Sequence, residues 1–293
     1  MKRLICILLL FNYTIVACSK INSETIVLNT PTKQTNIGNN QEQKKEESPD
    51  GVKEKKIEKD SPVPIEKLSH EKHGWGLSVT TNETSPGIPD SWKKMLERFD
   101  GFYIGPVEQK KVYLTFDCGY ENGYTEDIIN VLVKNKVPAI FFIVGHYITS
   151  RPDLVKKMAD HGFLIGNHTV NHSSIPTLTD TEINKEVLGL NESIKKLTGK
   201  EPIYFRPPSG EFSEYSLAVV SNLGFKTIFW SLALRDWIPL PGGAEESYNT
   251  IMERIHPGAI ILLHAVSKDN HDAMQRIIDG IRAKGYEFAP IDF

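Results

Sequence analysis

The feature that most constrains the fold is an alternation of strand-like and helix-like stretches from residue 111 to the end of the chain. The strand-like runs are short and almost entirely apolar, as in Ala139-Ile140-Phe141-Phe142-Ile143, which is typical of strands covered on both faces of a sheet. They lie at 111–117, 139–145, 163–168, 203–207, 227–233, 259–264 and 288–291. Strands separated by helices in this way predict a parallel sheet with right-handed crossovers.

The stretches between these strands have the amphipathic pattern and the end signals of helices. They lie at 125–135, 151–161, 180–198, 213–223, 245–255 and 273–284. Gly162, Gly199, Gly224 and Gly285 each follow one of them, at the place where a helix commonly ends in a glycine. We therefore predict an α/β fold, an incomplete or distorted (β/α)7 barrel, with an open doubly wound sheet as the alternative.

The first 18 residues have the pattern of a bacterial secretion signal. Lys2 and Arg3 precede an apolar run that is short for a permanent membrane span. The segment Ile15-Val16-Ala17-Cys18 resembles a lipobox, which implies cleavage and lipidation at Cys18. An ordinary signal peptide and an uncleaved anchor are the alternatives. We expect a lipoprotein anchored in the membrane that acts outside the cytoplasm, at the cell envelope.

The composition changes twice along the rest of the chain. Residues 19–65 are polar, lack aromatic side chains and carry charges of alternating sign, which predicts a disordered tether, with a helical surface arm as the alternative. Aromatic residues return in 66–109, which we expect to be the lead-in of the domain, with a short helix at 91–99. Residues 110–293 form the main domain. The net charge of −3 argues against a nucleic-acid partner, and we expect a monomer.

Unusual polar residues follow the ends of several predicted strands. They are Asp117 and Cys118 after the first strand, His168 and His172 after the third, Arg206 near the end of the fourth, Asp236 and Trp237 after the fifth, and His264 at the end of the sixth. Because the carboxyl ends of parallel strands meet at one edge, we expect these side chains to converge on one site.

The pair His168 and His172 is a candidate for metal binding. The spacing i, i+4 places both imidazoles on one side of a helical turn, and imidazole suits zinc, iron, cobalt or nickel. Two capping or surface histidines are the alternative. A third ligand at the end of the first strand would complete a catalytic site with an open position for water.

These residues belong to motifs that resemble the NodB-type polysaccharide deacetylases, carbohydrate esterase family 4. The five motifs, in order, are Thr115-Phe116-Asp117-Cys118-Gly119, His168-Thr169-Val170-Asn171-His172, Arg206-Pro207-Pro208-Ser209-Gly210, Asp236-Trp237 and Leu262-Leu263-His264. Further segments, among them Trp75-Gly76 and His256-Pro257-Gly258-Ala259, are similar to the sporulation branch of this family. That branch contains the peptidoglycan N-acetylmuramic acid deacetylases of muramic δ-lactam formation in the spore cortex.

The resemblance implies a metal-dependent hydrolysis of an N-acetyl group on peptidoglycan glycan strands. It implies one divalent metal, zinc before cobalt, manganese or nickel, on His168 and His172. It implies that Asp117 is the general base, held by Arg206, and that His264 is the general acid, supported by Asp236. It places Trp237, Leu262, Tyr120 and Pro208 among the substrate-binding residues. A deacetylase of N-acetylglucosamine in peptidoglycan or chitin-like polymers is one alternative, and an inactive carbohydrate-binding lipoprotein is another.

Cys118 is the one position at which the chain departs from the pattern of the broad family, which has an aspartate ligand there. As a thiolate, Cys118 would complete the metal site with the two imidazoles. Alternatively the thiol stays protonated, and the two histidines and water hold the metal. A covalent cysteine hydrolase is a third interpretation.

Overall fold

The structure, a computed structural model, describes residues 65–293. The predicted signal peptide, the lipidation site at Cys18 and the tether lie outside these residues. Across 65–293, no helix combines the length and the apolar character that a membrane crossing requires.

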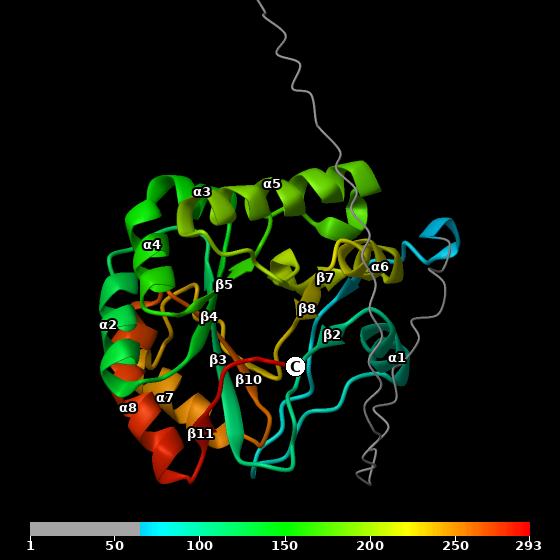
Figure 1. The fold of residues 1–293 in the computed structure, drawn as a ribbon. Helices are drawn as coiled ribbons and strands as arrows, with labels where there is room; N and C mark the ends of the chain where they lie inside the picture. Colours follow the sequence, from blue (N-terminus) through cyan, green and yellow to red (C-terminus); the bar gives the residue numbers. More distant parts are fainter. Residues whose placement is uncertain (1–64) are drawn as a thin grey trace, which may run out of the picture. The chain divides into compact units, whose positions relative to one another are not determined.

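One parallel sheet forms the centre of the fold, and it curls into an incomplete barrel (Figure 1). Its hydrogen-bonded order is β2-β8-β6-β5-β4-β3-β10-β9, and β11 also pairs with β3. The strands are β2 (Gly101–Phe102), β3 (Lys111–Cys118), β4 (Ala139–Ile143), β5 (Leu164–Asn167), β6 (Tyr204–Phe205), β8 (Lys226–Ile228), β9 (Leu232–Ala233), β10 (Ile260–His264) and β11 (Glu287–Phe288). The barrel prediction is confirmed, and the open doubly wound alternative is wrong.

The predicted strand at 227–233 is two strands in the structure. β8 pairs with β6 and β2, whereas β9 pairs with β10 at the other end of the sheet. Residues 229–231 link these two ends, and the Ser231 N–H donates to the Ile260 carbonyl over 3.0 Å. Because β8 and β9 belong to one short stretch of chain, this stretch brings the two ends of the sheet towards each other, which a single straight strand could not do.

Helices cover the outside of the sheet (Figure 1). They are α1 (Asp90–Arg98), α2 (Thr125–Asn135), α3 (Gly145–Ser150), α4 (Pro152–Asp160), α5 (Asp180–Thr198), α6 (Glu214–Asn222), α7 (Gly243–Arg254) and α8 (Lys268–Ala283), with short 3₁₀ turns at Ile65–Lys67, Ile175–Thr177 and Pro208–Gly210. The predicted bounds of α2 and α5 are confirmed. The sequence prediction missed α3, and it began α8 at 273 although Ser267 caps this helix at its first turn.

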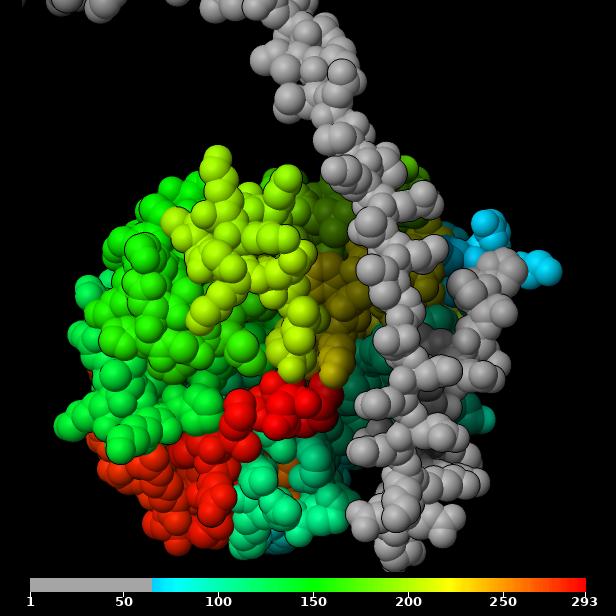
Figure 2. Space-filling view, viewed as in Figure 1, coloured from blue at the N-terminus to red at the C-terminus, as the bar shows by residue number. Residues whose placement is uncertain are grey.

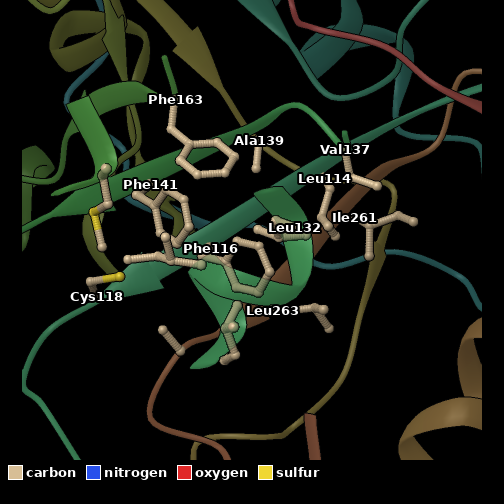
Figure 3. Packing of buried hydrophobic residues seen from close by; sticks show 14 of the residues in the cluster. Leu114, Phe116, Cys118, Leu132, Val137, Ala139, Phe141, Phe163, Ile261 and Leu263 are labelled. Carbon is tan, nitrogen blue, oxygen red and sulfur yellow. The ribbon is translucent and has the colours of Figure 1, made fainter. Parts of the chain in front are cut away.

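Side chains of β3 alternate between two cores. Tyr113 belongs to the cluster inside the barrel, with residues such as Phe142 and Ile260. Phe116 and Cys118 belong to the cluster between the sheet and the helices, and Figure 3 shows them packed with Phe141 and Leu263. This is the two-residue period of a β-strand, and it decides which residues of the first motif reach the site.

The ends of the described chain pack against the barrel. The C-terminal segment (red) lies at the centre of the face drawn in Figure 2. Its Phe293 ring contacts Tyr113 at a centroid distance of 5.1 Å, near the start of β3 and away from Asp117. In the lead-in, β1 (His73–Gly74) pairs with β7 (Glu211–Phe212), and Trp75 packs on Phe229.

Gly258, just before β10, lies against Gly105 of the lead-in. A substitution at Gly258 therefore tests how tightly these two segments pack. Its φ is +77°, and a Cβ there would lie 2.5 Å from the carbonyl oxygen of Gly105. We expect Gly258→Ala to lower the free energy of unfolding by at least about 2 kcal/mol, from backbone strain and this clash. Urea unfolding measures the loss. Gly285→Ala is the matched control, because Gly285 has a φ of +81° but open space around it. Equal losses in both variants would contradict the role of the clash.

Candidate active site

A cavity of about 1490 Å³ lies at the carboxyl ends of the strands. The catalytic candidates that line it are Asp117 from β3, His168 and His172 from the loop after β5, and His264 from β10. Asp117 and His264 are register partners of neighbouring strands. The predicted convergence of distant residues on one site is therefore seen in the structure.

Asp117 forms a buried ion pair with Arg206. The Arg206 Nη1 donates to the Asp117 Oδ1 over 2.7 Å, and both side chains are almost completely buried. Burial acts to raise the pKa of Asp117, but nearby positive charge, chiefly that of Arg206, outweighs it and holds this pKa below its ordinary value. Asp117 is therefore an ionised carboxylate at neutral pH, and it faces the cavity.

Arg206 is fixed by several further contacts inside the barrel. Its Nη2 donates to the Thr115 Oγ1 over 2.9 Å, and its Nε donates to the Ile228 carbonyl over 3.0 Å. Its guanidinium also stacks over the Phe142 ring, 4.1 Å from the centroid. Thr115, which the sequence prediction assigned no role, lies one inward-facing position before Asp117 on β3. The side-chain alternation of the strand was the signal that could have identified it.

The two histidines converge, although not through a helical turn. The His168 and His172 ring centroids lie 4.9 Å apart at an interplanar angle of 79°. Thr169 and His172 have φ values of +70° and +56°, so the segment is an irregular loop with two left-handed residues. The predicted helical turn is wrong, because the loop must leave β5 sharply and return to α5.

His168 is held in one tautomer. Its Nδ1 lies 2.7 Å from the Arg206 carbonyl oxygen, to which it donates, and its Nε2 lies 3.5 Å from the Asp117 Oδ2. Burial lowers the pKa of His168 to about 4, so the ring is neutral at pH 7. A neutral imidazole whose other nitrogen is held by a carbonyl is the usual arrangement of a metal ligand.

The residues present fit a divalent metal that is held by two imidazoles. His168 and His172 lie beside an ionised carboxylate on the wall of one cavity. Among residues 65–293, no group of three or more His, Cys, Asp or Glu is arranged to hold a metal ion. Two protein nitrogens would therefore leave the remaining positions to water and substrate.

Cys118 is not part of this site, which corrects the interpretation of its thiolate as a metal ligand. It is fully buried in the cluster between sheet and helices and is absent from the cavity wall. Burial, together with the charges of Asp117 and Glu121, raises the pKa of its thiol well above the ordinary value. Neighbouring residues of a strand face opposite sides, so only Asp117 faces the cavity. The same placement argues against a cysteine nucleophile.

His264 and Asp236 form the second polar pair of the site. The His264 Nδ1 lies 2.7 Å from the Asp236 Oδ1, and the His264 backbone N–H donates to the Oδ2 over 2.9 Å. Burial acts to lower the pKa of His264, but the hydrogen bond and charge of Asp236 outweigh it and raise this pKa. Asn270, which the sequence prediction missed, is fully buried and donates to Asp236. No motif marks Asn270 in the sequence.

Three of the four predicted substrate-binding residues line the cavity. Trp237 and Tyr120 are 49% and 52% exposed, and the Trp237 ring lies 5.3 Å from that of His264. Leu262 lines the cavity deeper in the barrel. Pro208 is buried and does not reach the cavity, which Ser209 and Gly210 line instead. Its assignment is therefore corrected.

Together the fold and the site define an incomplete-barrel hydrolase. An ionised carboxylate and an imidazole with a raised pKa are register partners, so one cavity holds a proton acceptor and a proton donor on adjacent strands. The imidazoles of His168 and His172 line the same cavity as this carboxylate, and burial lowers the pKa of both rings.

Comparison with known proteins identifies the family. The polysaccharide deacetylase family matches residues 104–228. The chain is 41% identical over 229 residues to the peptidoglycan-N-acetylmuramic acid deacetylase PdaA of Bacillus subtilis, covering 78% of this chain and 87% of that protein. It is 30% identical to a peptidoglycan-N-acetylglucosamine deacetylase of Bacillus cereus, covering 73% and 78% of the two chains. The structure of Bacillus subtilis PdaA, a family 4 carbohydrate esterase, superposes with a TM-score of 0.74 at 40% identity, covering 77% of this chain and 97% of that one.

The chain therefore belongs to the polysaccharide deacetylase family, as the sequence motifs predicted. It is a hydrolase that acts on amide bonds, and deacetylases of this family are in general metal-dependent.

Asp236→Asn tests the origin of the raised pKa of His264. Without the carboxylate we expect this pKa to fall, because the hydrogen bond and charge of Asp236 raise it. A histidine whose pKa is higher in the folded protein than in the unfolded chain stabilises the folded state. This contribution is complete below the unfolded pKa of about 6.5, and it is lost as the pH rises through the folded pKa. The variant should lose this pH-dependent stability. NMR titration of the His264 ring and unfolding at several pH values measure both effects.

Asp153→Asn, which breaks an exposed ion pair with Arg151, is the control. An unchanged His264 pKa in Asp236→Asn would contradict the assignment.

Cys118→Ala tests the placement of the thiol. We expect wild-type zinc affinity and a loss of about 1 kcal/mol in unfolding free energy, because a small buried side chain is removed. Peptide mapping after iodoacetamide treatment should find Cys118 unmodified in the native full-length protein and modified after denaturation. A large fall in zinc affinity would restore the thiolate-ligand interpretation.

Proposed function

We propose that this protein removes the acetyl group from N-acetylmuramic acid residues of peptidoglycan. The observation that carries the proposal is the pairing of an ionised Asp117 with a His264 of raised pKa on adjacent strands of one cavity. Hydrolysis of an unactivated amide needs both functions, since a proton must leave the attacking water and another must reach the departing amine.

The proposed reaction uses these residues in sequence. Asp117 takes a proton from water as the water oxygen forms a bond to the acetyl carbon, and Arg206 holds the carboxylate in place. The C–N bond then breaks as His264 gives its proton to the amine, and Asp236 stabilises the imidazolium until that point. Acetate and a free amino sugar are the products.

A bound metal and the cavity walls complete the proposed site. His168 and His172 would hold one divalent metal, with zinc proposed first and cobalt, manganese or nickel as alternatives, and it would supply Lewis-acid polarisation of the acetyl carbonyl. Trp237 and Leu262 would enclose the acetyl group. Tyr120 offers an exposed ring to the sugar, and the backbone N–H of a residue near Tyr120 is a candidate donor to the oxyanion.

The muramic preference is supported by the similarity to PdaA over most of both chains. A second candidate is N-acetylglucosamine, which the relative from Bacillus cereus supports at lower identity. An inactive carbohydrate-binding lipoprotein has less support, because such a protein has no need for an acid and a base with opposite pKa shifts.

We propose the setting from the N-terminal sequence and from the substrate named for PdaA. The protein would act as a monomer outside the cytoplasm, anchored by lipid on Cys18, with the segment after it as a tether. Its glycan substrate would be peptidoglycan, and its product would serve muramic δ-lactam formation in the spore cortex.

Acetate release from peptidoglycan fragments tests the proposed reaction. We expect release by the zinc-loaded protein and a fall of about 10²–10⁴-fold in Asp117→Asn, which removes the base. Asp153→Asn should keep wild-type activity, since Asp153 is exposed, pairs with Arg151 and does not line the cavity. Fragments rich in muramic acid and fragments of N-acetylglucosamine alone separate the two candidate substrates. No acetate with any of the four metals would overturn the proposal.

A further inference from the structure

The loop that carries His172 has a conformation that it would not hold by itself. His172 has a φ of +56° and Thr169 a φ of +70°, in a region that side chains other than glycine rarely adopt. Such conformations persist only where the surroundings fix them. The structure should therefore contain groups outside the metal-ligand pair that hold this loop.

Glu186 of α5 is the group that contacts the loop on both sides of His172. Its Oε2 accepts from the Asn171 backbone N–H over 2.8 Å, and its Oε1 accepts from the Asn171 side-chain amide over 2.6 Å. The Oε1 also accepts from the Ser173 hydroxyl over 3.3 Å. The backbone carbonyl of Glu186 accepts from the Val170 N–H over 3.0 Å. One residue thus binds three loop positions that flank His172.

Glu186 is buried, and the hydrogen bonds that satisfy its carboxylate come from this loop. Glu186 is only 8% exposed, and burying a carboxylate costs free energy unless the group is paired or hydrogen-bonded. Within the described part of the chain it forms no ion pair with lysine or arginine. The side-chain donors that satisfy it come from Asn171 and Ser173. A carboxylate with two oxygens can accept from all three donors, whereas an amide cannot.

We propose that Glu186 is a positioning residue that holds His172 in the orientation required to bind the metal. It touches neither substrate nor the reacting atoms and acts through the loop. This inference rests on the proposed metal-dependent function and deepens it, because it extends the metal site to a residue of α5. Partners that orient metal ligands from outside typically contribute about 10–100-fold to affinity.

The test measures zinc binding to the full-length apo protein by competition with a chromophoric chelator. We expect Glu186→Gln to weaken zinc binding at least tenfold, because the amide would turn an N–H group towards one of the loop donors. Glu192→Gln is the matched control on the same helix, because Glu192 is exposed, and it should bind zinc like the wild type. Thermal unfolding of each apo protein reports folding separately. Wild-type zinc affinity in Glu186→Gln would overturn the proposal.

Asn171→Ala provides a second test that does not depend on the folding of Glu186→Gln. Asn171 is exposed, so this variant should fold normally, and we expect zinc binding to weaken about threefold from the loss of one of the contacts. The double variant should bind zinc no more weakly than Glu186→Gln alone, because both changes act through the same group of hydrogen bonds between Glu186 and the loop. Wild-type affinity in Asn171→Ala, or fully additive effects, would overturn the proposal. Zinc affinity needs no turnover, so a failure of the deacetylase proposal would appear separately, as absent acetate release by the wild type.

Discussion

The buried ion pair between Asp117 and Arg206 is the interaction on which the site depends. It lies at the boundary between the apolar interior of the barrel and the cavity, where an unpaired charge would be very costly. Removing one partner of such a pair typically destabilises a protein by about 3–5 kcal/mol. The Thr115 hydroxyl and the carbonyls of Ile228 and Phe229 accept further hydrogen bonds from the guanidinium. The same pair that permits a charge at this depth also keeps Asp117 ionised, so the stability of the site and the ionised state of this carboxylate arise from one contact.

The site contains two opposite pKa shifts, one on β3 and one on β10. On β3, the positive charge of Arg206 holds the pKa of Asp117 low, and on β10 the negative charge of Asp236 holds the pKa of His264 high. Each catalytic candidate therefore has its own partner from another element, although the two are register neighbours. This separation allows a proton acceptor and a proton donor to coexist in one cavity without neutralising each other.

Local sequence patterns predicted the elements well and the contacts less well. α5 was predicted at its observed bounds because Thr179 and Glu182 form a capping box and Gly199 ends the helix. The convergence of Asp117, His168 and His264 followed from parallel strands. The placement of Cys118 beside Asp117 in the site was wrong, because adjacent residues of a strand face opposite sides. Asn270 could not be predicted, since its contact with Asp236 spans 34 positions and depends on how α8 packs.

The lead-in has a consequence for the limits of the catalytic unit. Trp75 and Phe99 share one core with Phe212 and Phe229, and Lys72 pairs with Glu211, whose other oxygen accepts from Ser174 beside the histidine loop. The barrel wall on this side is thus completed by residues that precede the matched family region. Residues 65–109 and the barrel should lose structure in one cooperative transition. A fragment cut at the start of the family region would keep the five motifs and lose part of the core that supports them.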